Sequence, residues 1–346
     1  MNQLKTGPWN LTDLRNIKPN GKTVFSCFHC GGGSTMGYKL AGFNVLGGVE
    51  IDPEMMKIYR ANHNPLHSYL MGVQQFKNLP NDHLPKELFD LDILDGSPPC
   101  SSFSMAGSRE KAWGEKKKFR EGQSEQVLDD LFFDFIDIAK KLNPKIVVAE
   151  NVKGLIIGKA KGYVKEIYKQ FNNAGYDVQL FLLNAAFMGV PQKRERTFFI
   201  VRRKALKLPK IELRFNEKPI VCTTAFEGID PVGKPNSPDQ NKWWTLCKIG
   251  NAFSSVHPKG SWFNSFKLNP HDIAPTVTGS AGASASGFYH WSKPNHLSER
   301  GYNRLQTFPD DYNYCNQFSP YINGMSVPPF MMQRVADQIY KQWLVK

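Results

Sequence analysis

Residues able to do covalent and acid–base chemistry follow two short apolar segments of the chain. Cys100 comes after Pro98 and Pro99 and before two serines. An ionised thiol is a strong nucleophile, and the two prolines stiffen the turn that carries it. Glu150 follows the apolar run 146–149, where a partly desolvated carboxyl can donate a proton. A buried structural cysteine and a turn before a helix are the simpler interpretations of these residues.

Two arginines form a second candidate group. Arg194 and Arg196 alternate within the basic segment 191–196, just before a strand-like run, and so should share one face. There they could hold a phosphate or the edge of a base. The alternative is a solvated basic strand edge.

A glycine-rich turn, Phe28 to Gly33, follows the first apolar strand. Its glycines let a ligand approach the backbone, and the next helix offers free N–H groups. Glu50 ends the second strand, where a carboxylate can accept hydrogen bonds from ribose hydroxyls. The order GxGxxG is absent. A glycine turn and an acid suit NAD, FAD and S-adenosylmethionine alike, and the lack of a phosphate cradle favours the last.

Strand-like and helix-like segments alternate over residues 1–203 and position these groups. We expect strands at 22–27, 44–51, 88–94, 144–149, 177–183 and 197–201. We expect helices at 34–40, 53–62, 129–142 and 164–174. The alternation predicts an α/β fold with a doubly wound, mostly parallel sheet, whose ligands bind beyond the carboxyl ends of the strands.

The pattern then breaks, which divides the chain into three predicted parts. Residues 204–317 are irregular, rich in Gly, Pro, Ser, Asn and aromatic residues, and predict a smaller second domain. Residues 318–346 include a helical pattern that should return to the first domain, 1–203.

Composition narrows the class of protein. The 346 residues carry a formal net charge of +13, which suits a polyanionic partner. No apolar run is long enough for a membrane span, and the N-terminus lacks an apolar signal core, so a cytoplasmic protein is expected. The six cysteines predict free thiols. Cys27 and Cys30 could be half a zinc site or a redox pair, but no second pair follows at zinc-ligand spacing, and no metal is predicted.

In their order along nearly the whole chain, these segments resemble the DNA (cytosine-5) methyltransferase family of bacteria and phages. The loop around Cys100 and the motif Glu-Asn-Val at residues 150–152 are specific to this family when they occur together, whereas the glycine turn alone is not. The resemblance is carried by Phe28 to Gly33, Val49 to Asp52, Pro98 to Ser104, Glu150 to Val152, Gln192 to Arg196, Arg300 with Arg304 to Asp310, and Gly324 to Pro328.

The chain departs from the family pattern at five positions. Ser26 stands where the family usually has Asp, and Cys30 where it has Gly. Gly72 replaces the Asp that contacts the adenine, Met325 replaces Asn, and Gly301 replaces Glu. These departures imply an altered cofactor affinity and leave the catalytic positions intact.

The resemblance implies a Rossmann-like methyltransferase that uses S-adenosylmethionine, with residues 204–317 as the target-recognition domain. It implies that Cys100 adds to carbon 6 of a cytosine flipped out of the duplex, and that Glu150 acts at ring nitrogen 3 and the amine. Arg194 would hold the carbonyl oxygen of the base, and Arg196 would support the thiol or a phosphate. The basic segment 102–122 would close over the base. The implied cofactor contacts are Phe28, Gly31, Gly33, Glu50, Ile51, Gly72, Val73, Pro99, Leu131 and Ser326.

The implied partner is double-stranded DNA, bound by a monomer. A cognate restriction endonuclease acting on the same site would complete a restriction-modification pair. Three alternatives remain open at this point. They are methylation of tRNA by a relative, whose Cys-Phe-Thr sequence is not found here, a nucleotide-dependent oxidoreductase, and a catalytically silent DNA-binding relative.

Overall fold

The computed structural model describes residues 7–99, 130–157, 161–262, 264–280 and 286–345, and the backbone of two short strands, β5 (Lys116–Lys117) and β6 (Gln126–Val127). The chain divides into two compact units. The large-sheet unit comprises residues 17–183, 195–214 and 333–346. The small-sheet unit comprises residues 1–16, 184–194 and 215–332, and so contains most of the segment 204–317.

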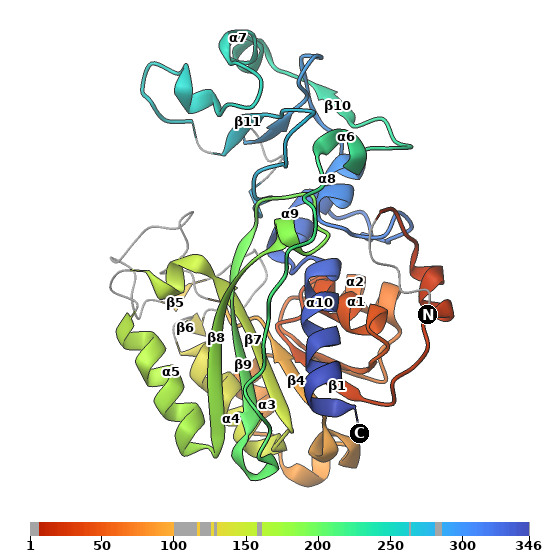
Figure 1. Ribbon diagram of the computed structural model, residues 1–346, viewed down its shortest axis with the longest axis vertical. Coiled ribbons are helices and arrows are strands. Elements are labelled where there is room, and N and C mark those ends of the chain that lie inside the picture. The colour runs from red at the N-terminus through yellow and green to blue at the C-terminus, as the bar shows by residue number, and fades with distance from the viewer. Residues whose placement is uncertain are drawn as a thin grey trace. The chain divides into compact units, whose positions relative to one another are not determined.

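A seven-stranded sheet organises the large-sheet unit, with strand order β3-β2-β1-β4-β7-β9-β8 (Figure 1). Strand β1 pairs in parallel with β2 and β4, β2 with β3, and β4 with β7, whereas β9 is antiparallel to β7. The mostly parallel sheet confirms the predicted α/β fold. The strands are β1 (Thr23–Cys27), β2 (Asn44–Glu50), β3 (His67–Leu70), β4 (Ile93–Gly96), β7 (Ile146–Val152), β8 (Tyr176–Asn184) and β9 (Glu195–Arg203).

Helices cover both faces of this sheet, because its strands are apolar on both sides. On one face, Phe25, Leu94, Val147 and Phe199 form a core with three helices. These are α3 (Val73–Lys77), α4 (Leu131–Leu142) and α5 (Lys161–Asn173). Helix α1 (Gly33–Leu40) contacts the opposite face, where the Tyr38 hydroxyl donates a hydrogen bond to Asp95 of β4.

Most of the expected elements are confirmed to within a few residues. Helix α2 (Pro53–His63) begins at its proline, and the Asp52 side chain caps it by accepting from two backbone N–H groups. The expected strand 88–94 is wrong in its first half, because residues Lys86–Asp90 form a 3-10 helix and β4 starts only at Ile93. A short apolar run does not by itself distinguish a buried turn of helix from a strand.

The small-sheet unit has a four-stranded sheet with strand order β10-β13-β12-β11. Two apolar clusters stabilise the unit, one around Phe226, Phe288 and Tyr302 and the other around Trp243 and Phe253. Its strands are β10 (Val232–Pro235), β11 (Ser265–Lys267), β12 (Gly287–Tyr289) and β13 (Asn295–Leu297). Its helices are α6 (Cys222–Ala225), α7 (Pro238–Leu246), α8 (Glu299–Leu305) and α9 (Ser319–Met325). These short elements confirm the irregular pattern expected for this part of the chain.

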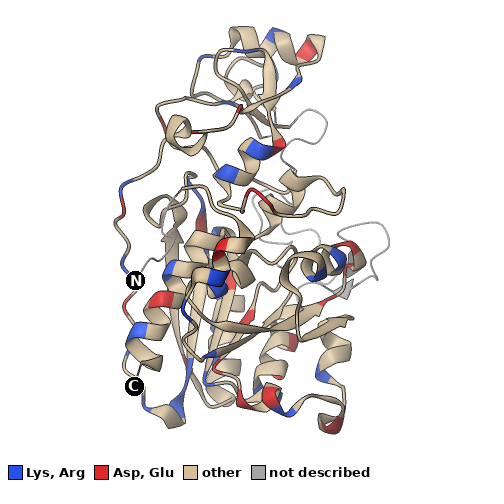
Figure 2. Cartoon of the chain, turned by 90° about the vertical axis from the view of Figure 1, so that its right-hand side faces the viewer, with Lys and Arg blue, Asp and Glu red and all other residues tan. Residues whose placement is uncertain are grey.

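The predicted C-terminal helix is present as α10 (Pro329–Ile339), followed by a π-helical turn at Tyr340–Leu344. In the large-sheet unit, the Gln333 side chain from α10 donates to the carbonyl of Leu40 at the end of α1. Figure 2 shows basic and acidic residues spread over both units, as expected from their distribution along the sequence. No helix in the described ranges is long and apolar enough to cross a bilayer.

Candidate functional site

The carboxyl ends of four neighbouring parallel strands carry most of the candidate residues of the large-sheet unit. The glycine turn follows β1, and Glu50 is the last residue of β2. Gly72 follows β3, and Pro98 and Pro99 follow β4. Because these strands are adjacent and parallel, their carboxyl ends meet at one edge of the sheet. The structure therefore gathers here residues that lie as far as 71 positions apart, between Phe28 and Pro99.

The glycine turn is held in an unusual backbone conformation. Phe28 and Cys30 have positive φ angles of 57° and 49°, and Gly32 has a φ of 80°. The Phe28 N–H donates to the carbonyl of Val49 at 2.9 Å, which ties the turn to β2. A Cβ at Gly32 would lie 2.3 Å from Nε2 of His63, so only glycine fits. The turn leads directly into α1, and its glycines, Gly31 to Gly33, are buried.

The Glu50 carboxylate is buried and accepts three backbone hydrogen bonds. Oε2 accepts from Cys30 N at 2.9 Å, and Oε1 accepts from Ile51 N and Asp52 N at 2.9 and 3.0 Å. Burial raises the pKa of this carboxyl, whereas the three N–H groups favour its ionised form. Since a carboxylate offers about four lone-pair positions, roughly one acceptor position remains for a ligand hydroxyl. The remaining acceptor position suits a hydroxyl of the ribose of S-adenosylmethionine.

Gly72, which follows β3, lies next to Ile51, the residue after Glu50. A Cβ at Gly72 would lie 3.6 Å from Cδ1 of Ile51, an ordinary contact distance, so Gly72 leaves this side of Ile51 uncrowded. Val73 starts α3 and is buried. Leu131 starts α4 and is fully buried in the core beneath the sheet, where it packs among apolar side chains.

Glu150 and Arg196 form a partly buried ion pair between adjacent strands. Arg196 Nε lies 3.0 Å from Glu150 Oε1, and the two side chains are 14% and 12% exposed. Arg196 of β9 is paired with Val152 of β7, two residues beyond Glu150, so both side chains project from one face of the sheet. Burial lowers the pKa of the Arg196 guanidinium, and the nearby Glu150 opposes that shift. The guanidinium therefore fixes the direction of the Glu150 carboxyl.

Asn151 is a residue of this site that the sequence reasoning did not single out. Its side chain is buried, and Nδ2 donates to the carbonyl of Pro98 at 3.0 Å. Its Oδ1 accepts from the N–H of Val152. The amide therefore ties the Pro98–Pro99 segment, which leads into Cys100, to strand β7. Its position between Glu150 and Val152 in the recognised motif was the available signal.

We expect that replacing Asn151 by Ala slows methyl transfer about 10- to 100-fold, because a misplacement of roughly 1 Å in a reacting group can cost that much. The lost hydrogen bond should also reduce the free energy of unfolding by about 1–3 kcal/mol, since it leaves the Pro98 carbonyl unpaired. Single-turnover methyl transfer and urea unfolding measure the two effects. Asn78→Ala, which removes an exposed helix-end bond to Gln74, is the control. An unchanged single-turnover rate in Asn151→Ala would show that the amide does not position the loop.

Arg194 lies in the small-sheet unit and does not share a strand face with Arg196. It precedes β9, and the residue is 2% exposed. Nη1 donates to the carbonyl of Val277 at 2.7 Å, and Nη2 donates to the carbonyls of Gly324 and Ser326 at 3.0 and 2.9 Å. These contacts favour a role for Arg194 in positioning backbone over direct contact with a base.

Ser326 and Gln192 belong to the same buried network of the small-sheet unit. The Ser326 hydroxyl donates to the carbonyl of Ile322 at 2.8 Å. The Gln192 amide donates to the carbonyl of Leu305 and to Oε1 of Gln306 and accepts from the N–H of Val277. The segment from Gln192 to Arg194 therefore holds together the short elements of this unit. Gln192 was not among the predicted site residues.

Cys100 and most of the segment 102–122 lie outside the described residues. Five other cysteines are free thiols, namely Cys27, Cys30, Cys222, Cys247 and Cys315. Burial next to Asp95 raises the pKa of the Cys27 thiol far above its usual range, which makes it a poor nucleophile. Within the described part of the chain, no group of three or more His, Cys, Asp or Glu side chains could hold a metal ion.

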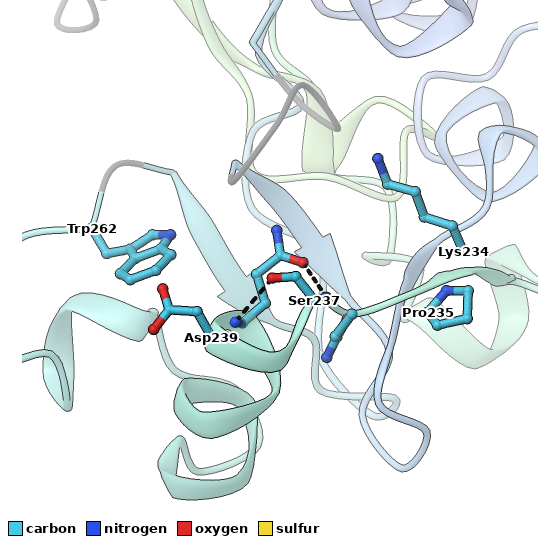
Figure 3. Close-up of a pocket in the computed structure, with 7 residues that line it drawn as sticks. Lys234, Pro235, Ser237, Asp239 and Trp262 are labelled. Carbon is cyan, nitrogen blue, oxygen red and sulfur yellow. Dashed lines mark hydrogen bonds between the residues drawn. The ribbon is translucent and has the colours of Figure 1, made fainter.

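A pocket of about 490 Å³ lies in the small-sheet unit at the start of α7 (Figure 3). It holds none of the predicted site residues. In the view of Figure 3, Trp262 and Asp239 lie on one side of the pocket and Lys234 on the other. The pocket thus combines an aromatic ring with hydrogen-bond donors and hydrogen-bond acceptors. The lining residues are Lys234, Pro235, Asn236, Ser237, Asp239, Gln240 and Trp262.

The chain is similar in sequence and fold to known methyltransferases. Residues 23–341 match the family model described as C-5 cytosine-specific DNA methylase. The type II methyltransferase M.NgoPII of Neisseria gonorrhoeae is 31% identical over 236 residues, which are 66% of this chain and 64% of that protein. The type II methyltransferase M1.HphI of Haemophilus parahaemolyticus is 27% identical over 92% of this chain and 87% of its own. A crystal structure described as a DNA modification methyltransferase encoded within an E. coli prophage superposes with a TM-score of 0.74 at 20% identity, covering 94% of this chain and all of that one.

Proposed function

Because the chain belongs to the C-5 cytosine-specific DNA methylase family and so methylates cytosine in DNA with S-adenosylmethionine, we propose that Cys100, Glu150 and Arg196 carry the reaction. The observation that supports this assignment most directly is the hydrogen bond from Asn151 to Pro98. It links the segment that precedes Cys100 to the strand that carries Glu150. The ion pair with Arg196 orients Glu150 at the same edge of the sheet.

The thiolate of Cys100 adds to carbon 6 of cytosine and forms a sulfur–carbon bond, which makes carbon 5 nucleophilic. Glu150 stabilises this addition by donating a proton or a hydrogen bond at ring nitrogen 3. The cofactor supplies an electrophilic methyl group to carbon 5. Loss of the carbon 5 proton to a base then expels the Cys100 thiolate, which restores the aromatic ring and the free enzyme.

The cofactor site that we propose lies at the carboxyl ends of β1 to β4. Glu50 accepts a hydrogen bond from a ribose hydroxyl, and Phe28, Gly31 and Gly33 form the backbone turn against the cofactor. Ile51, Gly72 and Val73 line the side where the adenine lies. Pro99 completes the proposed set in this unit, and Leu131 and Ser326 remain contacts that the family resemblance implies. Arg194 acts as a positioning residue through the three carbonyls that it holds.

We further propose that residues 204–317 form the target-recognition domain. The pocket at the start of α7 supports this role, since carboxylate, amide and ammonium groups recognise the edges of bases and an aromatic ring stacks on them. The net charge of +13 favours binding to the phosphates of the duplex. Because the thiol cannot reach carbon 6 in a stacked duplex, the target cytosine must flip out.

Three finer points belong to the same proposal. The similar type II methyltransferases support a cognate restriction endonuclease that acts on the same sequence. The reaction needs one polypeptide, so we propose a monomer. The site of action is the cytoplasm, where bacterial or phage DNA is accessible.

A trapping assay with DNA that carries 5-fluorocytosine tests the proposed function. The fluorine replaces the proton that must leave carbon 5, so the enzyme should stall as a covalent complex that survives a denaturing gel. We expect this complex with double-stranded DNA and S-adenosylmethionine, and only in certain sequence contexts. Matched tRNA transcripts with 5-fluorocytosine form the control. Trapping on tRNA but not on DNA would overturn the assignment of the substrate.

A further inference from the structure

Asp95 is a buried carboxyl that the proposed mechanism does not use. It is 2% exposed and lies on β4, directly opposite Ser26 of β1 in the strand register. The Ser26 hydroxyl donates to Oδ2 at 2.7 Å, and the Tyr38 hydroxyl donates to Oδ1 at 3.2 Å. Ser34 also forms a hydrogen bond with it. All of these donors are neutral hydroxyl groups.

In the described part of the chain, no lysine, arginine or histidine forms a salt bridge with Asp95. Buried carboxylates are normally paired with a cation, because removing an unpaired charge from water is costly. The other buried carboxyl next to β4 follows this rule, since Asp92 lies 2.7 Å from the ammonium of Lys145. Among the residues that the structure describes, Asp95 therefore differs from Asp92 in having no protein counter-charge.

The groups that face Asp95 do not supply positive charge either. Glu150 of β7 carries a charge of the same sign as Asp95 and raises its pKa. Arg196, the cation next to Glu150, already forms an ion pair with Glu150. Cys27 of β1, Tyr38 of α1 and Tyr59 of α2 are neutral, and the charge of Asp95 contributes to raising the pKa of each. The environment of Asp95 is therefore net negative or neutral on every side that the structure describes.

Asp95 lies between the cofactor turn and the segment that leads to the nucleophile. Its partner Ser34 directly follows Gly33, the last glycine of the turn. Two residues after Asp95, the N–H of Ser97 points at the carbonyl of Cys27, at 3.4 Å. A cation bound at the glycine turn is thus the natural partner for this charge. S-adenosylmethionine has a cationic sulfonium, and the product S-adenosylhomocysteine has a neutral thioether in its place.

We propose that Asp95 is a positioning residue whose carboxylate, which has no cationic partner among the described residues, favours the sulfonium, so that the site binds S-adenosylmethionine more tightly than the product. This inference rests on the cofactor site proposed above. It gives a physical reason for product release, since methyl transfer removes the one charge that the carboxylate favours.

The proposal predicts a pH dependence with a definite sign. Burial, opposed by the hydrogen bonds from Ser26 and Tyr38, raises the pKa of Asp95 to about 7. A cationic ligand binds the ionised form better, so the affinity for S-adenosylmethionine should increase as the pH rises through about 7. The affinity for the uncharged thioether should lack this increase. The ratio of the two affinities should change by roughly tenfold, as expected for one partly screened charge pair.

Calorimetric titration of both ligands at pH 6, 7 and 8 tests this proposal on the full chain. In the wild type we expect the preference for S-adenosylmethionine to grow with pH. In Asp95→Asn we expect a preference about tenfold smaller at pH 8 and independent of pH. Asp92→Asn is the matched control, because it removes a buried carboxyl from the amino end of the same strand. It should lower stability and leave the ratio of affinities unchanged.

Two further variants keep the test decisive if Asp95→Asn does not fold. The double variant Ser26→Asp with Asp95→Ser exchanges the two facing residues, so a carboxylate and a hydroxyl group are still paired there. It should restore the preference for S-adenosylmethionine that Asp95→Asn loses. Tyr38→Phe removes one donor to the ionised carboxylate and should move the pH midpoint upward. An unaltered ratio in Asp95→Asn, or a midpoint that does not move in Tyr38→Phe, would overturn the role of Asp95 alone. A wild type that binds neither ligand would overturn the cofactor site as well.

Discussion

Replacing Cys100 by Ser is expected to reduce methyl transfer to DNA by roughly 10⁴-fold or more, since loss of an activated nucleophile typically has effects of that order. The hydroxyl has a far higher pKa than a thiol, so the covalent bond to carbon 6 would not form. Incorporation of a radioactive methyl group into DNA measures the rate. The same variant should form no covalent complex with DNA that carries 5-fluorocytosine.

The control for this variant is Cys315→Ser, which changes a free, partly exposed thiol outside the proposed site. It should retain full activity and trapping. Cys100→Ser should also retain its affinity for DNA and for S-adenosylmethionine, because the thiol is needed only for chemistry. Substantial methyl transfer by Cys100→Ser would contradict the covalent mechanism.

Replacing Glu150 by Gln is expected to lower kcat by about 10²- to 10⁴-fold, the range typical of a lost general acid. The amide keeps the shape of the side chain but cannot give up a proton in the same way. The change should also reduce the free energy of unfolding by about 1–3 kcal/mol, because the buried Arg196 guanidinium loses its ionic partner. Steady-state kinetics and urea unfolding separate these effects.

The double variant Glu150→Gln with Arg196→Gln distinguishes catalysis from stability. Removing both charges should recover much of the lost stability, since no buried charge is left unpaired. Activity should stay low, because the acid is still absent. Glu195→Gln, which breaks only an exposed pair with Lys153, should change neither quantity by much. Recovery of activity in the double variant would show that Glu150 serves the fold alone.

Local patterns in the sequence predicted the main features of the large-sheet unit. Short apolar runs marked β1, β2 and β7, and helical spacing marked α4. The glycine turn, Glu50 and Glu150 were found because each follows such a run directly. These predictions succeeded since strand and helix periodicity depends on residues that are close in the sequence.

The first half of the expected strand 88–94 could not be predicted correctly, because Leu88 is buried in either conformation. The expected shared face of Arg194 and Arg196 also required knowledge of where β9 begins. The structure starts β9 at Glu195 and gives Arg194 a separate set of partners, 83 to 132 positions away. The local alternation of the two arginines contains no information about these contacts.

The sequence alone thus predicted the family, the chemistry of its side chains and most strands and helices of the large-sheet unit. Only the tertiary structure decided that Asn151 holds Pro98, that Arg194 binds three carbonyls, and that Asp95 faces the hydroxyl of Ser26. Each of these contacts joins segments that are distant in the chain. Their existence depends on strand register and helix packing, which are set by the burial of the whole core rather than by any local pattern.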